Sequence, residues 1–218
     1  MRSIRRRLRR PVANVSFNVE VIGPEPPGAT PIAEEDLEGL IPDFVATRAD
    51  LNQVEYENIL RHLPLAERRA RRGGPQEVLT VAFVTDLHRG MFSDVWRWAG
   101  TLRRRETNIG VDSHLIALRC AEALDDARFW VTESVYPPDE LAARVHARLV
   151  SIHPFPNGNG RCTRLLADLY LVGVGRSAFT WGSATIDPGG ASRDRYLADL
   201  LHALETDDFE PLIDFAKS

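Results

Sequence analysis

The chain has 218 residues, of which 44% are hydrophobic and 27% charged, and it is long enough to form a sizeable globular core. Lys217 is the only lysine, and Cys120 and Cys162 are the only cysteines. These counts exclude a lysine-dependent phosphate loop, a Schiff-base lysine, a disulfide scaffold and a four-cysteine zinc site. No apolar run approaches the length of about 18 residues that spans a bilayer, so we expect a cytoplasmic protein with no membrane partner.

Six arginines lie within the first ten residues, and without them the net charge of −4 becomes −10. We interpret residues 1–30 as a flexible basic leader, with a short strand pattern over 15–21 and a loop rich in proline and glycine over 23–28. The acidic body argues against nucleic-acid binding outside this leader. Binding of nucleic acid or of an acidic partner through the leader itself is the alternative that its charge leaves open.

Residues 31–79 are predicted to form a helical extension. Their pattern favours a short helix over 32–40 and a second helix from Asp50, its predicted N-cap, to about residue 72, with an interruption at Pro64. A third helical pattern covers residues 77–98, where apolar residues recur every three or four positions.

The segment Thr101–Val111 is polar and rich in arginine, and Asn108 and Gly110 within it predict a β-hairpin flap. Helical patterns then recur over the rest of the chain, with starts near residues 112, 138, 161, 192 and 209. His153 lies at the C-terminal edge of the helix that Pro154 ends. The fold is therefore predicted to be mainly α.

Residues 153–164 read His-Pro-Phe-Pro-Asn-Gly-Asn-Gly-Arg-Cys-Thr-Arg and are the most informative stretch of the chain. A backbone that turns through Asn157–Gly160 and then enters a helix points several N–H groups at one place, which favours an anion. Arg161 and Arg164 follow in the first helical turn, where exposed cations are disfavoured by roughly 0.3–1 kcal/mol each. Their presence indicates a stronger negative charge, and His153 can move a proton near neutral pH. The stretch predicts a phosphate-binding group-transfer site.

This stretch resembles the HxFx[D/E]GNGRxxR signature of the Fic (Fido) family. Residues 87–100, 193–196 and 210–215 resemble further segments of the family, so we predict a Fic domain over residues 80–218. Asn52 and Glu55–Ile59 look most like the branch of the family called mobile mystery protein B.

The resemblance implies a Fic-type helical core with a short β-hairpin flap, and transfer of AMP from ATP to a Ser, Thr or Tyr hydroxyl of a target protein. It implies that His153 is the catalytic base and that Phe155 anchors the loop. Nucleotide-binding roles fall on Asn157, Gly158, Asn159, Gly160, Arg161 and Arg164, with the phosphates held by backbone N–H groups, the Asn159 amide and the two arginines. The flap would align an extended target segment by strand addition through Arg105, Thr107, Asn108, Ile109 and Gly110.

Asn157 departs from the family pattern, which has Asp or Glu at this position as the ligand of Mg²⁺. Mg²⁺ favours carboxylate ligands, so the resemblance implies Mg²⁺ as cofactor but with weaker binding here. The alternative is a catalytically weak nucleotide-binding or regulatory module that works beside a partner, such as a small DNA-binding protein in a toxin–antitoxin pair.

A second family element is an inhibitory helix with the pattern [S/T]xxxE[G/N]. Glu38 and Gly39 match its end, although Glu34 stands at the first position. A pair between Glu38 and Arg164 is the inhibitory hypothesis, and a solvated Glu38 is the simpler interpretation. We interpret Arg103–Arg105 as a solvated turn, with substrate contact as the alternative, and His88 as a packing residue.

Overall fold

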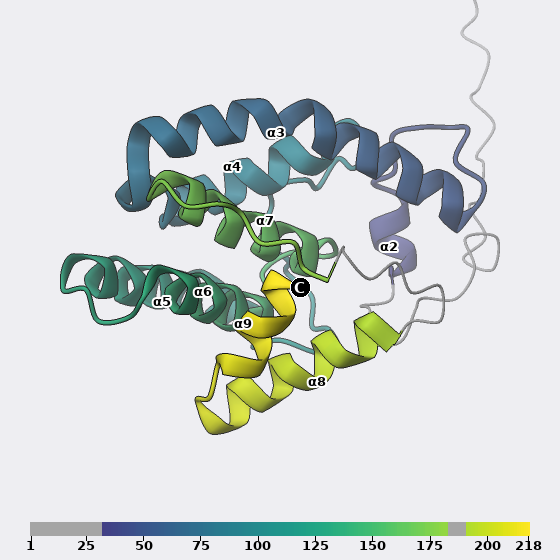
Figure 1. Ribbon diagram of the computed structural model, residues 1–218. Helices are drawn as coiled ribbons and strands as arrows, with labels where there is room; N and C mark the ends of the chain where they lie inside the picture. The colour runs from purple at the N-terminus through teal and green to yellow at the C-terminus, as the bar shows by residue number, and fades with distance from the viewer. Residues whose placement is uncertain (1–31, 183–190) are drawn as a thin grey trace, which may run out of the picture.

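We examined a computed structural model of the protein, which describes residues 32–182 and 191–218. The fold is mainly helical, as predicted, and α7 (Asn159–Gly173) lies at its centre (Figure 1). α7 packs against α3 (Arg48–Val78) and α4 (Val81–Phe92) on one side and against α6 (Pro138–Ile152) on the other. The basic leader and the strand pattern over 15–21 fall outside the described residues.

The remaining helices complete the bundle around α7. α5 (Ile116–Thr132) follows the short 3₁₀ helix η1 (Ser113–Leu115) and lies along α6, while α8 (Ala191–Thr206) and α9 (Glu210–Lys217) pack on each other and on α6. α2 (Glu34–Leu37) lies near the start of α3 in Figure 1. Among the described residues, no helix has both the length and the hydropathy needed to cross a membrane.

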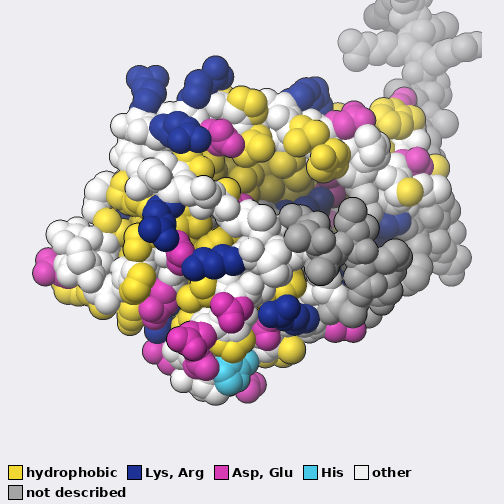
Figure 2. Space-filling model, viewed as in Figure 1, with side chains coloured by type: hydrophobic (Ala, Val, Ile, Leu, Met, Phe, Trp, Pro, Cys, Tyr) yellow, Lys and Arg dark blue, Asp and Glu magenta, His cyan; other side chains and the backbone are white. Residues whose placement is uncertain are grey.

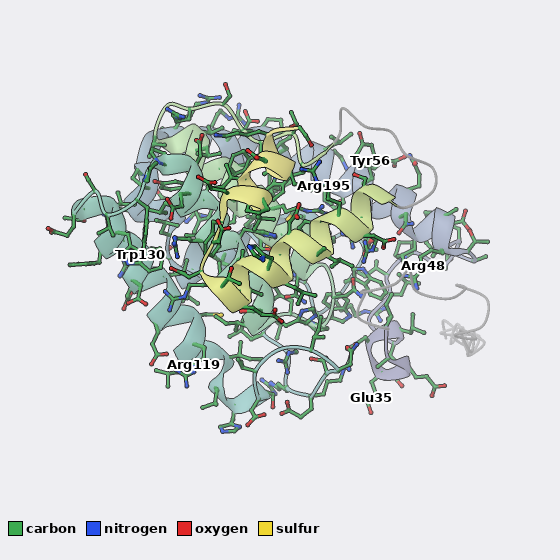
Figure 3. The ribbon with its side chains drawn as sticks, turned by 60° about the horizontal axis from the view of Figure 1, so that its bottom comes forward. Glu35, Arg48, Tyr56, Arg119, Trp130 and Arg195 are labelled. Carbon is green, nitrogen blue, oxygen red and sulfur yellow. The ribbon has the colours of Figure 1, made fainter. Side chains whose placement is uncertain are left out.

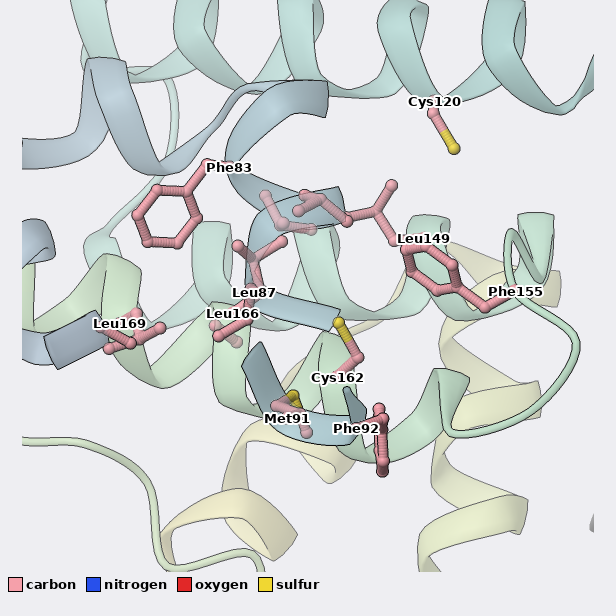
Figure 4. Close-up of a cluster of buried hydrophobic side chains, with 14 of the residues drawn as sticks. Phe83, Leu87, Met91, Phe92, Cys120, Leu149, Phe155, Cys162, Leu166 and Leu169 are labelled. Atoms are coloured by element: carbon pink, nitrogen blue, oxygen red, sulfur yellow. The ribbon is translucent and has the colours of Figure 1, made fainter. Parts of the chain in front are cut away.

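The hydrophobic core surrounds α7 because that helix is apolar on most of its circumference. Figure 4 shows residues of α4, α6 and α7 meeting there, with Phe155 inserted from the loop before α7. Ile32 and Leu51 of the predicted extension belong to the same cluster as Phe83 and Leu149. The boundary between residues 31–79 and 80–218 stays a prediction, but both segments contribute to one core.

The predicted start of the helix from Asp50 and its predicted interruption at Pro64 were wrong. Thr47 is the N-cap of α3, and Asp50 is the third residue of a capping box, in which the Asp50 carboxylate accepts from the Thr47 N–H at 2.9 Å. α3 continues through Pro64 and kinks only at Gly74 (φ 63°). Burial of residues on both sides of Pro64 against α4 and α7 outweighs the one hydrogen bond that proline removes.

α4 ends at Phe92 and not near Trp98, because the following residues pair with the N-terminal segment. The Ile41 N–H donates to the Val95 carbonyl at 2.9 Å, and the Arg97 N–H donates to the Gly39 carbonyl at 2.8 Å. Leu40 and Trp96 thus form an isolated antiparallel bridge. This pairing fixes α2 against the body. In Figure 3, Glu35 projects outward from α2, whereas the adjacent Asp36 is buried and binds Arg105.

The predicted β-hairpin flap is absent from residues 101–111, which form an irregular loop. The turn signals at Asn108 and Gly110 are present, but the buried guanidinium of Arg103 takes the place of cross-strand bonds. It donates to the carbonyls of Arg105 and Val111, the first and last residues of the segment Arg105–Val111. The loop is therefore closed by a side chain, and its backbone does not form a ladder.

The face drawn in Figure 2 carries both basic and acidic side chains. Figure 2 shows acidic side chains gathered near a histidine at the turn between α8 and α9, where Asp207 and Asp208 are exposed. It also shows hydrophobic side chains over the middle of α3, and Tyr56, Leu60 and Leu65 of this helix are about half exposed.

Candidate active site

The loop between α6 and α7 turns through two left-handed residues, one at each helix end. His153 is the C-cap of α6 (φ 58°, ψ 60°), and Gly158 is the N-cap of α7 (φ 77°, ψ 3°). Between them, Phe155 is fully buried. Pro154 prevents α6 from continuing, and the hydrophobic anchor fixes where the loop meets the core. The loop therefore carries His153 and the first turn of α7 side by side on one rigid bend.

Asn159 locks this bend from inside. Its amide oxygen accepts from the Phe155 N–H and its amide nitrogen donates to the Phe155 carbonyl, both at 2.8 Å. The residue is only 2% exposed. The predicted phosphate contact through the Asn159 amide is therefore corrected: this amide serves the loop, and the backbone N–H is what Asn159 can offer to an anion.

His88 of α4 holds the loop from the other side. The Gly100 N–H donates to His88 Nδ1 at 2.9 Å, so Nδ1 is unprotonated and Nε2 carries the proton that it donates to the Asn157 carbonyl at 3.0 Å. The imidazole also stacks on Phe155, with ring centroids 3.7 Å apart. Burial lowers the pKa of His88 to about 3. His88 was predicted as a packing residue, and its hydrogen bonds show that it also fixes the loop.

The first turn of α7 is open where an anion would bind. A Cβ built on Gly160 would meet no atom of the described residues within 4 Å, whereas one on Gly158 would lie 2.7 Å from the Phe92 ring. The first N–H groups of a helix have no partner within it, and they lie at the positive end of the helix dipole. This helix start thus combines backbone donors that the helix itself leaves without a partner, open space among the described residues, and the side chain of Arg161.

The two arginines have different environments. Arg161 Nη1 lies 2.7 Å from Glu55 Oε2, and its guanidinium lies over the Phe92 ring, 4.9 Å from the centroid. Arg164 donates from Nε to the Gly160 carbonyl at 3.2 Å and lies over the Tyr196 ring, 5.3 Å from the centroid. Burial lowers the pKa of Arg164, although the side chain stays charged at neutral pH. Both cations therefore lie next to the open turn.

Glu55 is a site residue that the motif analysis did not identify. Its side chain is 4% exposed, and its second oxygen accepts from Trp96 Nε1 at 2.7 Å. Glu38 is exposed, which agrees with the simpler interpretation and not with the hypothesis of a pair with Arg164, and its backbone carbonyl accepts from Arg97 Nη1 at 2.8 Å. The carboxylate that contacts the 153–164 stretch is therefore that of Glu55 on α3, and it pairs with Arg161.

His153 is nearly buried, with 5% of its surface exposed. Burial lowers the pKa of His153 to about 4, and the positive charge of Arg103 acts in the same direction. The imidazole is therefore neutral at pH 7 and can accept a proton. Gly110 of the predicted flap packs directly on it, since a Cβ on Gly110 would lie 2.6 Å from the His153 Cβ.

The other predicted flap residues lie at or near the surface beside His153. Thr107 donates from its hydroxyl to the Ile109 carbonyl at 2.6 Å, and Asn108 and Ile109 are exposed. Arg105 is held by Asp36, to which its Nε donates at 3.1 Å. These residues form an accessible edge next to the histidine.

A buried hydrogen-bond chain supports the first turn of α7 from behind. Thr163 donates its hydroxyl proton to the Asn159 carbonyl at 2.9 Å, so it accepts from His146 Nδ1 at 3.0 Å. His146 Nε2 then accepts from the Tyr196 hydroxyl at 3.0 Å. Burial lowers the pKa of His146 to about 3. Burial therefore keeps His146 neutral, and its two hydrogen bonds link α8 to the turn that carries the arginines.

The residues around Gly158 do not fit a Mg²⁺ ion held by the protein. The Asn157 side-chain oxygen accepts from the Gly158 N–H at 2.7 Å, and both oxygens of Glu55 are engaged by Trp96 and Arg161. Among the described residues, no group of three His, Cys, Asp or Glu side chains could hold a metal ion. Mg²⁺ prefers several oxygen ligands with carboxylates among them, and this donor set lacks them.

The model of the Fic/DOC family matches residues 78–171, a range that contains the His153 loop, the open turn and both arginines. These residues are similar to a Fic/DOC domain.

Relatives of the Fic/DOC domain include the protein adenylyltransferase Fic of Drosophila melanogaster, 30% identical over 133 residues that cover 58% of this chain. The chain spans only 27% of that protein's length. A Fic-domain signaling protein of Bacteroides thetaiotaomicron shares the fold, with a TM-score of 0.61, 22% identity, and coverage of 74% of this chain and 66% of that one. The effector BepC of Bartonella tribocorum, solved with bound AMPPNP, has a TM-score of 0.52, 17% identity, and coverage of 76% and 85%.

Proposed function

We propose that the protein is a nucleotidyltransferase that moves AMP from ATP to a Ser, Thr or Tyr hydroxyl of a target protein. The observation that carries the proposal is the open first turn of α7 at Gly160, flanked by two arginines and by the neutral imidazole of His153. The name of the Drosophila relative, protein adenylyltransferase, supports this reaction. The AMPPNP bound to BepC, which shares the fold, supports a nucleotide as the anion.

The proposed roles follow from charge and position. Backbone N–H groups of Asn159, Gly160 and Arg161 would bind phosphate oxygens, and the guanidinium groups of Arg161 and Arg164 would neutralise the outer phosphates. The target hydroxyl oxygen would attack the α-phosphorus, and the bond to the β-phosphate bridge would break to release pyrophosphate. His153 would take the hydroxyl proton, which it can do because it is uncharged at neutral pH. No role is given to a metal ligand of the protein.

The surface beside His153 is proposed as the place where the target docks. Thr107, Asn108 and Ile109 present an accessible edge, and Gly110 lets that edge approach His153 closely. An extended target segment could pair with this irregular edge by main-chain hydrogen bonds, without a preformed hairpin.

Glu55 is proposed to restrain nucleotide binding. Its carboxylate pairs with the Arg161 guanidinium, so a phosphate that binds this guanidinium must compete with the carboxylate. We also infer that the chain belongs to the mobile mystery protein B branch, on the sequence at Asn52 and Glu55–Ile59.

The second candidate function is a nucleotide-binding module that transfers little or nothing. Asn157 favours it, because the amide oxygen is used by Gly158 and supplies no charge for a metal. A small DNA-binding partner, as in a toxin–antitoxin pair, would belong to this alternative.

Incubation of the purified chain with ATP labelled at the α-phosphate and a cell lysate tests the proposal. If the protein is a nucleotidyltransferase, we expect a labelled protein band that disappears with His153→Ala and persists with His114→Ala. His114 is the control because it is exposed on η1. Calorimetry with ATP on the same preparations separates the two candidates. Binding without any label favours the module, and the absence of both contradicts the nucleotide site.

A further inference from the structure

We propose that Arg103 is a positioning residue that fastens the target-docking loop, Arg105–Val111, to the backbone of His153. This inference deepens the proposed function and rests on it, because it explains how a docked target would be held at a fixed distance from the base. The sequence alone indicated a solvated turn at Arg103, and the structure places its side chain inside the protein.

The Arg103 side chain is 1% exposed and donates to two segments that lie far apart in the sequence. On the side of α6, Nε donates to the His153 carbonyl at 2.7 Å and Nη2 donates to the Ile152 carbonyl at 3.5 Å. On the side of the loop, Nη1 donates to the Arg105 carbonyl at 2.9 Å and Nη2 donates to the Val111 carbonyl. One guanidinium group thus bridges the two parts of the proposed site.

The charge of Arg103 suits this position. The carbonyls of Ile152 and His153 lie at the C-terminal end of α6, where helical carbonyls lack partners and where the helix dipole favours a cation. The nearest carboxylate, of Glu106, lies 3.7 Å away and is 64% exposed, so it offers only weak compensation. Burial accordingly lowers the pKa of Arg103. A buried arginine held mainly by carbonyls is well explained by a bridging role.

Main-chain bonds run in parallel with this bridge. The Arg103 N–H donates to the Pro154 carbonyl at 2.9 Å, and the Val111 N–H donates to the Ile152 carbonyl at 3.2 Å. Gly110 lies between them, packed on the His153 Cβ. Without the guanidinium, buried carbonyls on both sides would lose their donor, and the loop would be held at His153 by these two bonds alone.

Lysine cannot replace this bridge, because its compact ammonium lacks the planar fork that reaches both segments at once. Arg103→Lys therefore keeps the charge and most of the volume and removes the geometry. Arg104→Lys is the matched control, because Arg104 is the exposed neighbour in the same segment.

Amide hydrogen exchange tests the bridge without any assumption about activity. We expect Arg103→Lys to accelerate exchange of the backbone amides at position 103 and at Val111 at least tenfold, with α5 unchanged. Arg104→Lys should leave all of these amides as in the unmodified chain. Arg103→Gln should have a larger effect in the same direction. Unchanged exchange at Val111 in a folded Arg103→Lys variant would overturn the proposal.

The label-transfer assay then tests the positioning role. We expect Arg103→Lys to lower kcat at least tenfold, with a change of less than twofold in the KM for ATP. A parallel rise in the KM for ATP would show general damage to the nucleotide site and would also overturn the positioning role. If the unmodified chain transfers no label, the proposed function fails, and the exchange experiment still decides whether Arg103 holds the loop.

Discussion

Two glycines of the α6–α7 loop should respond in opposite ways to the same small change, replacement by alanine. Gly160 lies within the first turn of α7, and a Cβ there would meet nothing within 4 Å. Alanine is the better helix former, by up to about 1 kcal/mol in a helix interior and less near the end. We therefore expect Gly160→Ala to leave the free energy of unfolding unchanged or to raise it slightly.

Gly158 lies two residues earlier and has the left-handed conformation at φ 77°. Alanine in that conformation costs about 1–2 kcal/mol. Its Cβ would also lie 2.7 Å from two atoms of the Phe92 ring, which is fully buried and has no free space to move into. Such overpacking typically costs about 1–3 kcal/mol. We expect Gly158→Ala to lower the free energy of unfolding by about 2–4 kcal/mol, measured by urea denaturation followed by circular dichroism.

Gly160→Ala should weaken nucleotide binding even though it does not lower stability. The methyl group of Gly160→Ala fills the open space where phosphate oxygens are proposed to approach the N–H groups. We expect the affinity for ATP, measured by calorimetry, to fall at least tenfold, equal to about 1.4 kcal/mol, in a variant that is as stable as the unmodified chain. If Gly160→Ala binds ATP as tightly as the unmodified chain does, the phosphates do not lie over this turn and the reasoning is refuted.

Three further perturbations test the electrostatics of the site. Glu55→Gln keeps an oxygen for Trp96 Nε1 and removes the charge that pairs with Arg161, so calorimetry should find ATP bound about tenfold more tightly. Glu57→Gln is the exposed control on α3, and an unchanged affinity in Glu55→Gln would show that Glu55 does not restrain ATP binding. Asn157→Asp supplies the missing carboxylate, so Mg²⁺ should raise the ATP affinity of this variant more than that of the unmodified chain, and an equal effect on both would count against a role for residue 157. Burial lowers the pKa to about 3 or 4 in three histidines, His88, His146 and His153. Below their unfolded value near 6.5 the unfolded chain binds protons that the native chain does not, so stability falls as the pH falls. Asp168, whose pKa burial raises to about 7, acts in the opposite direction. The free energy of unfolding should drop by about 3 kcal/mol from pH 7 to pH 5, and equal stability at both would contradict the buried neutral histidines.

The conformation of the α6–α7 loop depends on local signals in the sequence. Pro154 must end α6, and a glycine that can adopt a positive φ must begin the next helix at Gly158. Those two constraints explain why α6 ends at His153 and why Gly158 is the N-cap of α7. The helical pattern around them extends over whole turns, and the described helices follow it closely.

The parts that the sequence missed depend on contacts between distant residues. Glu55 meets Arg161 across 106 positions, His88 meets Asn157 across 69, and Arg103 meets His153 across 50. No local pattern encodes such pairs. The family pattern led to Glu38 because its sequence context matched the end of the motif, and the three-dimensional fold leaves that side chain exposed.

The predicted hairpin failed for the same reason. Asn108 and Gly110 are genuine turn residues, but a hairpin also needs free carbonyl groups on the flanking residues. Arg103 occupies the Val111 and Arg105 carbonyls, and no propensity scale could show that this arginine is buried.

A crystal structure of the chain with a non-hydrolysable ATP analogue would test the central claim most directly. The account predicts phosphate oxygens within hydrogen-bonding distance of the Gly160 and Arg161 N–H groups, with the Arg161 guanidinium moved from Glu55 to the nucleotide. A nucleotide bound elsewhere, with Arg161 still paired to Glu55 and the first turn of α7 empty, would contradict it.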